Sequence, residues 1–376
     1  MTGHIEFRVM TKQLGNLASV QDSESNRISV MGFAVRMLVG GFKLPFVLLD
    51  LVTATWFSQI YEVDGLVSLS SDKPVLFYIH YSRNDKLTQR EIDTLAAAQS
   101  AGFQTCLVIN SNQPSQKNFE LIKDQYKSVS DAQIIRRNKG YDLGGYRDSY
   151  SLLKKRGTGE FKSVFFMNNS VLWFPPLVKN YLKKTLSQKA DIVSSTISSQ
   201  YQKHIQTFFF GSLTSNGIQE LGTWLDTIRN WRSKRTIVRF GEIATGKMFK
   251  KDIRIVSFPN SEIVQENSLK KIHKSFTSKS GDIPYQIIRR LVSNREFAFN
   301  GIPTNPSHSN WLELLEAGFP GIKIDLIRTN PTGIPDYEVV ISHLLKNGVE
   351  ISEINKLISS NKPKSLLLRI RVFLKV

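Results

Sequence analysis

Segments typical of strands and of helices alternate between Pro74 and Met167, and no other feature of this 376-residue chain restricts its fold as strongly. The strand-like segments are short and rich in β-branched and aromatic residues, whereas the segments between them have helical periodicity. The predicted strands are 74–81, 103–110, 132–137 and 161–167, and the predicted helices are 88–102, 115–129 and 149–155. Such alternation is the signature of βαβ units. We therefore predict an α/β fold with a doubly wound, mainly parallel sheet and helical decorations.

The first of these helices has clear start and stop signals. Thr88 and Glu91 have the spacing of a capping box, and Gly102 is placed to end the helix. Beyond Pro176 the alternation loosens, although helical and strand-like segments continue. There we predict helices at 178–186, 224–232 and 310–318 and a strand-like segment at 191–198, followed by an aromatic run at 207–212.

No internal repeat and no low-complexity linker marks a domain boundary. We predict an amino-terminal extension over residues 1–70, a main domain over residues 71–340 and a basic tail over residues 341–376.

The charge of the chain is strongly positive. Lys and Arg number 50 against 32 Asp and Glu, which gives a formal net charge of +18. The partners this favours are polyanions: nucleic acid, nucleotide phosphates or an anionic membrane surface. The single cysteine, Cys106, excludes an intrachain disulfide framework and a cysteine-based metal site. Residues 1–10 lack the pattern of a secretory signal, so we expect a cytoplasmic protein.

Residues 28–57 are the most apolar part of the chain, but Arg36, Lys43 and Asp50 interrupt them at every seventh position. These charges break every apolar window long enough to span a membrane, and they would share one stripe of a helix. The pattern fits a helix lying in a membrane interface, and it fits a core helical hairpin equally well. The tail 362–376 is apolar and basic, so it could bind anionic lipid or form a packed strand.

The densest group of candidate ligand-binding residues lies between the third predicted strand and the third predicted helix, in RRNKGYDLGGYRD, 136–148. Glycines there allow close approach of backbone to a ligand, and a helix beginning near Gly145 would direct unpaired N–H groups at an anion. Asp142 and Asp148 add carboxylates, while three arginines (Arg136, Arg137 and Arg147) could bind phosphate. The alternative is an ordinary tight turn in which Asp142 caps the helix.

A second candidate site follows the fourth predicted strand, where Asn168, Asn169 and Ser170 end an apolar run. In open α/β sheets, ligands bind at the carboxyl ends of strands. Amides and hydroxyls can bind ribose, sugar or phosphate, but neutral oxygens are poorer ligands for Mg²⁺ or Mn²⁺ than carboxylates are. The alternative is a turn whose side chains only satisfy the end of the strand.

Three further segments carry candidate catalytic or binding residues. His204 and Gln206 precede an apolar run, and we expect them at the same edge of the sheet. Glu242, at a predicted helix start, could act as a general base towards a substrate hydroxyl or could be an ion-paired cap. His308 precedes another predicted helix.

The order of these motifs resembles the rhamnan-synthesis F family. The resemblance rests on HY at 80–81, NKGYDLGGYRD at 138–148, NNS at 168–170, HIQTFF at 204–209, GE at 241–242, NPSHSNW at 305–311, GFPGIK at 318–323 and RTNP at 328–331. Each motif is weak alone, but their order and spacing are specific. Members of this family are regarded as glycosyltransferases of bacterial surface-polysaccharide assembly. The resemblance implies a GT-A-like fold, a nucleotide-sugar donor such as dTDP-rhamnose, and a lipid-linked glycan acceptor at the cytoplasmic membrane face.

Carried over by position, the resemblance assigns roles to individual residues. Glu242 would be the base of an inverting displacement, with His204 as a second catalytic residue, and Gln206 and His308 would contact the sugar or the acceptor. The donor nucleotide would be lined by His80, Asn138, Gly140, Tyr141, Asp142, Gly144, Arg147, Asp148, Asn168, Asn169 and Ser170. The chain departs from the family at Asn169, where the family prefers Asp, so dependence on Mg²⁺ or Mn²⁺ is an open question with Asp142 as the candidate ligand.

We therefore predict a glycosyltransferase, peripheral on the inner face of the cell membrane, that moves a rhamnose-like deoxyhexose to a lipid-linked polysaccharide. One alternative is a non-catalytic relative that binds glycan or nucleotide-sugar. The other is a basic nucleic-acid-binding protein, but no nucleic-acid-binding motif is present and the basic residues are dispersed.

Overall fold

The computed structural model describes residues 50, 53–55, 57–155, 161–199, 202–260, 305–328 and 337–359. The chain divides into two compact units, 1–53 with 363–376, and 54–362. The fold described below is that of the second unit. The predictions for the tail 362–376, and for nearly all of the segment 28–57, lie outside the described residues. No helix in the described ranges combines the length and the apolar character needed to cross a membrane.

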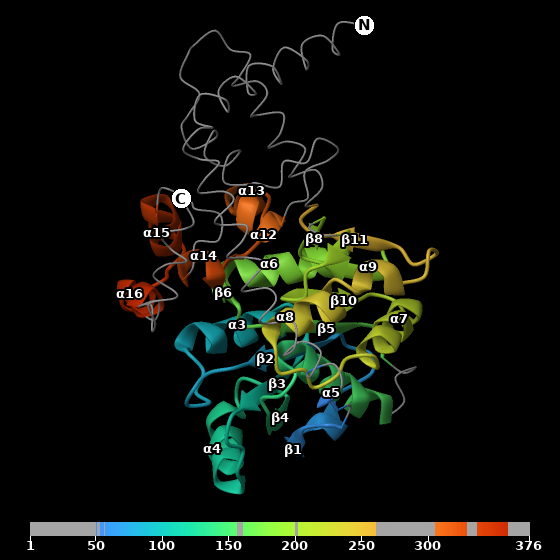
Figure 1. The fold of residues 1–376 in the computed structure, drawn as a ribbon. Coiled ribbons are helices and arrows are strands. Elements are labelled where there is room, and N and C mark those ends of the chain that lie inside the picture. Colours follow the sequence, from blue (N-terminus) through green and yellow to red (C-terminus); the bar gives the residue numbers. More distant parts are fainter. Residues whose placement is uncertain are drawn as a thin grey trace, which may run out of the picture. The chain divides into compact units, whose positions relative to one another are not determined.

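An eight-stranded sheet forms the centre of this unit, with the strand order β1-β4-β3-β2-β5-β10-β7-β11 (Figure 1). The central strands β2, β3, β4 and β5 pair in parallel. β1 and β10 run antiparallel to their neighbours, and β11 pairs in parallel with β7. The strands are β1 (Ile60–Asp64), β2 (Val75–His80), β3 (Gln104–Ser111), β4 (Ala132–Arg137), β5 (Val164–Asn168), β7 (Ile192–Ser194), β10 (Phe209–Ser212) and β11 (Ile255–Ser257). The predicted α/β fold with a doubly wound, mainly parallel sheet is confirmed.

Helices cover both faces of the sheet. One face packs against α3 (Gln89–Ser100), α4 (Gln116–Tyr126) and α6 (Pro175–Leu186), and the other against α5 (Tyr141–Lys155) and α7 (Ser215–Leu225). All six residues of β2 are buried, as expected of a central parallel strand. The predicted capping box begins α3: the hydroxyl of Thr88 accepts from the Glu91 N–H, and the Glu91 carboxylate accepts from the Thr88 N–H at 2.8 Å. The buried strand β2 and the capped start of α3 therefore match what the sequence predicted.

The strand order reverses at β2. From β2 the chain adds β3 and then β4 on one side, and β5 returns to the other side of β2. The carboxyl ends of these parallel strands lie at one edge of the sheet, and the junction of β2 and β5 is the topological switch point, where open α/β sheets bind ligands. His80 ends β2 and Asn168 ends β5, so the predicted NNS turn lies at this switch point.

The carboxyl-terminal elements add a third core beside the end of β5. The strand β6 (Val171–Trp173) pairs antiparallel with β12 (Gly321–Lys323). Around this ladder lie α12 (Pro306–Ser309), α13 (Trp311–Glu316), α14 (Ile324–Arg328), α15 (Tyr337–Lys346) and α16 (Ile351–Ser359). Leu344 and Ile354 pack in the same cluster as Leu172. The compact unit extends from residue 54 to residue 362, and the domain boundaries at 70 and 340 stay predictions.

Candidate functional site

The turn after β5 lies at the switch point, and its two asparagines have different partners. The Asn168 amide nitrogen donates to Asp142 Oδ2 at 2.8 Å. Its oxygen accepts from the Ser170 N–H at 3.0 Å and from the Ser170 hydroxyl at 2.6 Å. Asn168 therefore joins the turn to the start of α5, and its oxygen is already occupied by the protein.

The side chain of Asn169 joins the ends of β5 and β2. Its Nδ2 donates to the Tyr81 carbonyl at 3.0 Å, and its Oδ1 accepts from the Tyr81 N–H at 3.3 Å. A carboxylate could accept from the N–H but could not donate to the carbonyl. The structure therefore gives Asn169 a structural role that requires an amide, and both of its polar groups are in use.

We expect Asn169→Asp to destabilise the protein by about 1–3 kcal/mol, because the carbonyl of Tyr81 would lose its donor and face a carboxylate. We do not expect this variant to create dependence on a metal. Urea unfolding of the two proteins, with and without Mn²⁺, measures both effects. Asn112→Asp is the matched control, because Asn112 is exposed and its amide makes two long contacts, 3.3 Å to the Tyr81 hydroxyl and 3.4 Å to the Asn138 amide. An Asn169→Asp protein of wild-type stability would contradict the assigned role.

Asp142 lies in the first turn of α5, where its carboxylate contacts Asn168 of the turn after β5. The chain enters this helix through two residues with positive φ, Gly140 at 74° and Tyr141 at 52°, so α5 begins at Tyr141 rather than near Gly145 as predicted. Burial raises the pKa of Asp142 to about 6, against the opposing effect of Lys234 and Arg136, while Glu242 raises it further. Asp142 is therefore a carboxyl group that titrates near physiological pH.

The raised pKa of Asp142 predicts the pH dependence of stability. Between pH 4 and 6 the folded protein binds more protons at this carboxyl than the unfolded chain does, so its contribution to stability falls as pH rises. Asp142→Asn keeps the acceptor for Asn168 and removes the charge. We expect it to raise stability at pH 7 by about 1–3 kcal/mol and to flatten the profile below pH 6. Parallel denaturation series of the variant and the wild type at pH 4, 5, 6 and 7 test this; two parallel profiles would be the contrary result.

Glu242 ends a π-helical turn, η3 (Val238–Glu242), rather than beginning a helix as predicted. Its Oε2 accepts from the Thr207 hydroxyl at 2.8 Å. Its Oε1 lies 3.8 Å from His204 Nε2, which is too far for a hydrogen bond. Turns of this kind occur often at functional sites. Oε1 therefore keeps the capacity to accept a proton from a substrate.

His204 is held in a defined orientation beside this carboxylate. It lies in β9 (His204–Ile205), which pairs with β8 (Ile197–Ser198). Its Nδ1 lies 2.7 Å from the Gln202 carbonyl, so that nitrogen carries a proton and Nε2 faces Glu242. The adjacent Tyr146 hydroxyl donates to the Thr207 carbonyl at 2.8 Å, which fixes the segment 204–207 against α5. Two predicted catalytic residues, His204 and Glu242, are thus neighbours.

Three charged residues that the sequence motifs did not assign to the site lie near Asp142, Glu242 or His308. They are Lys234 of α8 (Lys234–Ile237), Lys323 of β12 and Asp325 of α14. Burial lowers the pKa of Lys323, while Glu242 and Asp325 oppose that change. Lys234 Nζ lies 3.5 Å from Asp325 Oδ2. The only sequence signal for Lys323 was its place in the motif GFPGIK, to which no role was attached.

His308 lies in the same charged surroundings. Burial, with Lys323 second, lowers its pKa to about 3, so the imidazole is neutral at physiological pH. Its Nε2 is buried and has no hydrogen-bond partner in the part of the chain that the structure describes. A buried polar atom without a partner is costly and is common where a ligand supplies the missing group. The predicted substrate-binding role of His308 is compatible with this geometry.

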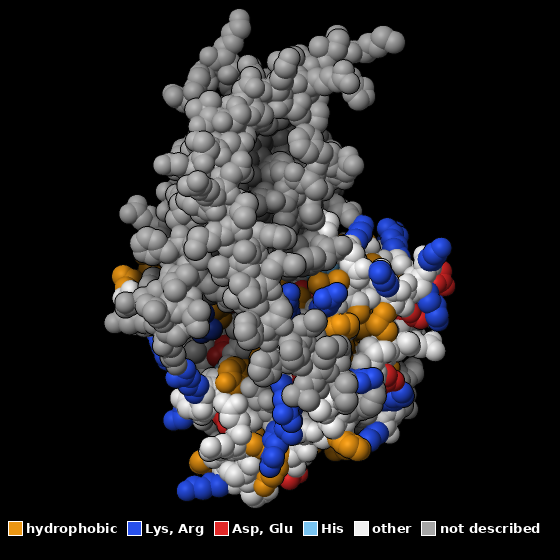
Figure 2. Space-filling model, in the orientation of Figure 1, with side chains coloured by type: hydrophobic (Ala, Val, Ile, Leu, Met, Phe, Trp, Pro, Cys, Tyr) orange, Lys and Arg blue, Asp and Glu red, His pale blue; other side chains and the backbone are white. Residues whose placement is uncertain are grey.

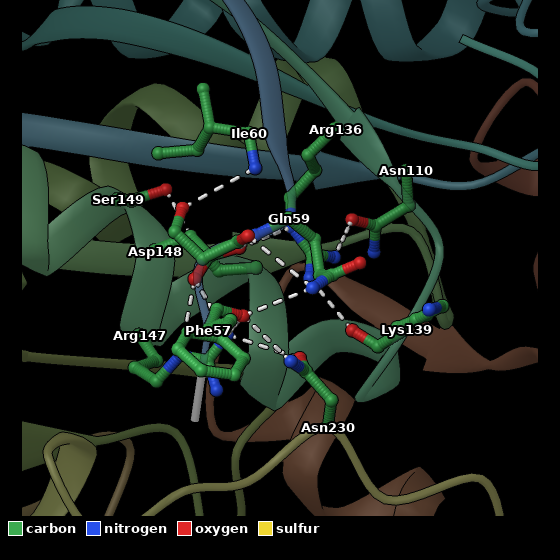
Figure 3. A network of polar contacts seen from close by, with 12 residues as sticks. Phe57, Gln59, Ile60, Asn110, Arg136, Lys139, Arg147, Asp148, Ser149 and Asn230 are labelled. Atoms are coloured by element: carbon green, nitrogen blue, oxygen red, sulfur yellow. Dashed lines mark hydrogen bonds and ion pairs between the residues drawn. The ribbon is translucent and has the colours of Figure 1, made fainter. Parts of the chain in front are cut away.

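Arg147 and Asp148, predicted to line a donor nucleotide, instead form a buried structural network (Figure 3). Asp148 accepts from Arg136 at 2.9 Å and from Arg147 at 2.7 Å, and the three side chains are at most 5% exposed. Arg147 also donates to the carbonyls of Ile228 and Phe57. Because Arg147 and Asp148 point into the interior of the helix layer, we correct their assignment from ligand binding to structure.

Other residues that were predicted to line the ligand site also have contacts within the protein. His80 is 1% exposed and lies 2.7 Å from the Glu91 carboxylate and 2.9 Å from the Ser82 hydroxyl. Gln206 is 1% exposed and accepts from the Thr196 hydroxyl at 2.6 Å. A Cβ on Gly144 would lie 2.4 Å from the Lys139 carbonyl, so that glycine permits close packing of its own chain.

Asn138 and Tyr141 lie at the outer rim of the loop 136–148. The Asn138 amide makes a long contact, 3.4 Å, with Asn112. Tyr141 is 41% exposed, and its hydroxyl donates to the Arg232 carbonyl at 3.2 Å. No interaction of these two residues contradicts their predicted place beside a ligand, and that place stays a prediction.

The described part of the surface is generally basic on the face that Figure 2 shows. Figure 2 shows Lys and Arg side chains spread over the described part of one face, with fewer Asp and Glu between them. Within the described ranges, no three His, Cys, Asp or Glu side chains come together in a way that could hold a metal ion. The residues gathered near the switch point therefore include the Glu242 carboxylate, the titratable carboxyl group of Asp142 and nearby ammonium groups.

Comparisons with known proteins found distant relatives, and no family model matches the chain. The virulence protein VirA of Vibrio anguillarum is 25% identical over 237 residues, which cover 57% of this chain and 68% of VirA. An uncharacterized protein, y4gN, of Sinorhizobium fredii is 36% identical over 124 residues, which cover 31% of this chain and 32% of y4gN.

Among solved structures, two glycosyltransferases are similar at low scores. The mannosyltransferase PcManGT of Pyrobaculum calidifontis, in complex with GDP-Man and Mn²⁺, has a TM-score of 0.29 at 11% identity, covering 93% of this chain and 95% of its own. The bifunctional glycosyltransferase WbbM has a TM-score of 0.26 at 11% identity, covering 46% of this chain and 38% of its own.

Proposed function

We propose that this chain is a glycosyltransferase that moves a sugar from a nucleoside-diphosphate donor to a hydroxyl of a glycan acceptor. The observation that carries the proposal is the position of Glu242 beside His204. Asp142 and Lys323 lie close enough to Glu242 that its charge affects the pKa of each of them. This group lies at the switch point of a doubly wound sheet, where such folds bind nucleotides. The order of motifs that resembles the rhamnan-synthesis F family supports the same class of reaction.

In the proposed reaction, Glu242 Oε1 accepts the proton of the acceptor hydroxyl. The acceptor oxygen forms a bond to the anomeric carbon while the bond from that carbon to the diphosphate oxygen breaks. The nucleoside diphosphate leaves with the electron pair of that bond, and a single displacement inverts the anomeric configuration. The hydrogen bond from Thr207 holds the other carboxylate oxygen, so Glu242 has one fixed orientation.

His204 and His308 have separate roles in this proposal. His204 Nε2 faces Glu242 and can bind the acceptor hydroxyl or share the proton of that hydroxyl with Glu242. The ring keeps this orientation because its other nitrogen, Nδ1, is fixed on the Gln202 carbonyl. His308 is neutral, and its Nε2 has no hydrogen-bond partner among the described residues, which suits a hydroxyl of the donor sugar or the acceptor.

Mg²⁺ or Mn²⁺ would be expected of a GT-A-like enzyme, and the residues at the end of β5 do not fit such an ion. Asn169 uses both polar groups on Tyr81, and Asn168 uses its oxygen on Ser170. Among the described residues, Asp142 is the one carboxylate hydrogen-bonded to this turn. Hard divalent ions prefer several oxygen ligands with carboxylates among them. The proposed reaction therefore contains no step on a metal ion.

The finer details of the proposal are a rhamnose-like deoxyhexose, a lipid-linked polysaccharide as acceptor, and a peripheral location at an anionic membrane surface. They rest on the resemblance to the rhamnan-synthesis F family and on the net charge of +18. A positive protein is attracted both to the donor diphosphate and to anionic lipid.

A binding screen tests the proposed function. Thermal-shift measurements on the full chain would use UDP, GDP, dTDP, their nucleotide-sugars and short oligonucleotides, followed by transfer assays with the stabilising donor. We expect stabilisation by one nucleoside diphosphate, none by oligonucleotides, and release of that diphosphate in the presence of an acceptor. Stabilisation without any turnover would favour the non-catalytic alternative, and stabilisation by oligonucleotides alone would favour a nucleic-acid-binding protein.

A further inference from the structure

Lys323 reaches the end of β5 from a distant part of the sequence. The ladder of β12 and β6 pairs Lys323 with Val171, the residue that follows Ser170. The next backbone amide, of Ile324, donates to the Ser170 carbonyl at 2.9 Å. The backbone of Lys323 is therefore fixed beside the NNS turn.

The side chain of Lys323 is also directed towards this turn. Its ammonium lies 5.0 Å from the centre of the Phe208 ring, and the Phe208 carbonyl accepts from the Asn168 N–H at 3.1 Å. An ammonium over an aromatic face is held by a modest attraction that leaves its N–H groups available.

The charges around Lys323 do not form a simple ion pair. The lysine influences Asp142, Glu242, Asp325 and His308 electrostatically, and the described structure gives it no salt bridge within 4 Å. Its burial is costly for an ammonium group without a close partner. A bound anion would supply that partner.

We propose that Lys323 neutralises the diphosphate of the donor at the place where a GT-A-like enzyme would hold a divalent metal, so that donor binding needs no metal. The proposal rests on the proposed function and names the group that replaces the ion. The amide at position 169 and the lysine at position 323 are two parts of one arrangement: the turn offers an amide that bonds Tyr81, and β12 brings in a fixed positive charge. Lys234 adds a second ammonium at the exposed side of the same cluster.

The test is calorimetric titration of the full chain with UDP, GDP and dTDP and with the matching nucleosides, after treatment with EDTA and again with added Mn²⁺. We expect one diphosphate to bind with the same affinity in both conditions. Lys323→Met should weaken that diphosphate tenfold to a hundredfold, the usual effect of removing one charge-assisted hydrogen bond, and should change nucleoside binding less than threefold.

Two further variants are controls for this test. Lys179→Met removes an exposed lysine of α6 and should leave both affinities unchanged. Lys323→Arg keeps the charge and should retain diphosphate binding within a few-fold, which matters if Lys323→Met folds poorly.

Diphosphate binding that appears only when Mn²⁺ is added would overturn the inference and leave the proposed function intact. Wild-type affinity in Lys323→Met would overturn it as well. If no nucleoside diphosphate binds in either condition, the proposed function fails and the inference fails with it.

Discussion

Replacing Glu242 with Gln should lower the turnover number for sugar transfer by about 10²–10⁴-fold, the usual contribution of a general base. The amide has the shape of the carboxylate and can still accept from the Thr207 hydroxyl, so the turn is expected to keep its structure. It cannot take a proton from the acceptor. Transfer assayed by release of the nucleoside diphosphate measures the turnover number, and calorimetry measures donor affinity, which we expect to change less than a few-fold.

Glu120→Gln is the matched control for this prediction. Glu120 lies on the exposed surface of α4, and its one hydrogen bond to a side chain within the described residues is from Gln116 at 2.9 Å, so its replacement should leave turnover unchanged. Retained turnover in Glu242→Gln would rule out Glu242 as the base. Asp142 would then be the next carboxyl group to consider, because its pKa of about 6 suits proton transfer near neutral pH.

Removal of the carboxylate at Asp148 should have the largest effect on stability. Asp148→Ala would leave the guanidinium groups of Arg136 and Arg147 buried, at 0% and 5% exposure, without their shared anion. The loss of one partner from a buried ion pair costs about 3–5 kcal/mol, a large part of the roughly 5–15 kcal/mol that stabilises a typical domain. We expect the unfolding midpoint in urea to fall sharply, and the purified variant to aggregate or fail to fold.

An exposed ion pair gives the comparison for Asp148→Ala. Asp226 pairs with Lys154 at 2.9 Å, and the two side chains are 47% and 58% exposed. Solvent screens such pairs, so Asp226→Ala should cost at most about 1 kcal/mol. If the two variants lost similar stability, the buried network would not have the structural role that we assign to it. A nucleotide-binding role for Asp148 would instead be indicated by a stable variant with weakened donor affinity.

The fold of the central layer could be predicted from local sequence because each element carries its own signals. β2 reads as a continuous apolar run because both of its faces are buried, and α3 begins at a capping box whose two hydrogen bonds join residues three positions apart. The switch point follows from the order of these elements and the rule for parallel sheets. The position of Asn168 at the carboxyl end of a central strand was therefore predictable from the chain alone.

The loop 136–148 was predicted less well, because the same composition suits both a phosphate-binding loop and a buried ion network. Arginines, carboxylates and glycines are what a phosphate-binding loop needs, and they are also what a buried ion network needs. The helix begins at Tyr141, four residues earlier than predicted, so Arg147 and Asp148 lie on its buried side. Asp142 alone of the carboxylates in this loop reaches the turn after β5.

Sequence alone determined the alternation of strands and helices, the edge of the sheet at which folds of this kind bind ligands, and the choice of His204 and Glu242 as candidate catalytic residues, since these depend on local periodicity and on the order of motifs. Tertiary structure alone decided which polar side chains are free to act. Asn169 is engaged with the backbone of Tyr81, and Lys323 reaches the same turn through a three-residue ladder with β6. The physical reason is that pairing between distant segments is set by packing of the whole chain, and such short ladders leave no periodic signal in the sequence.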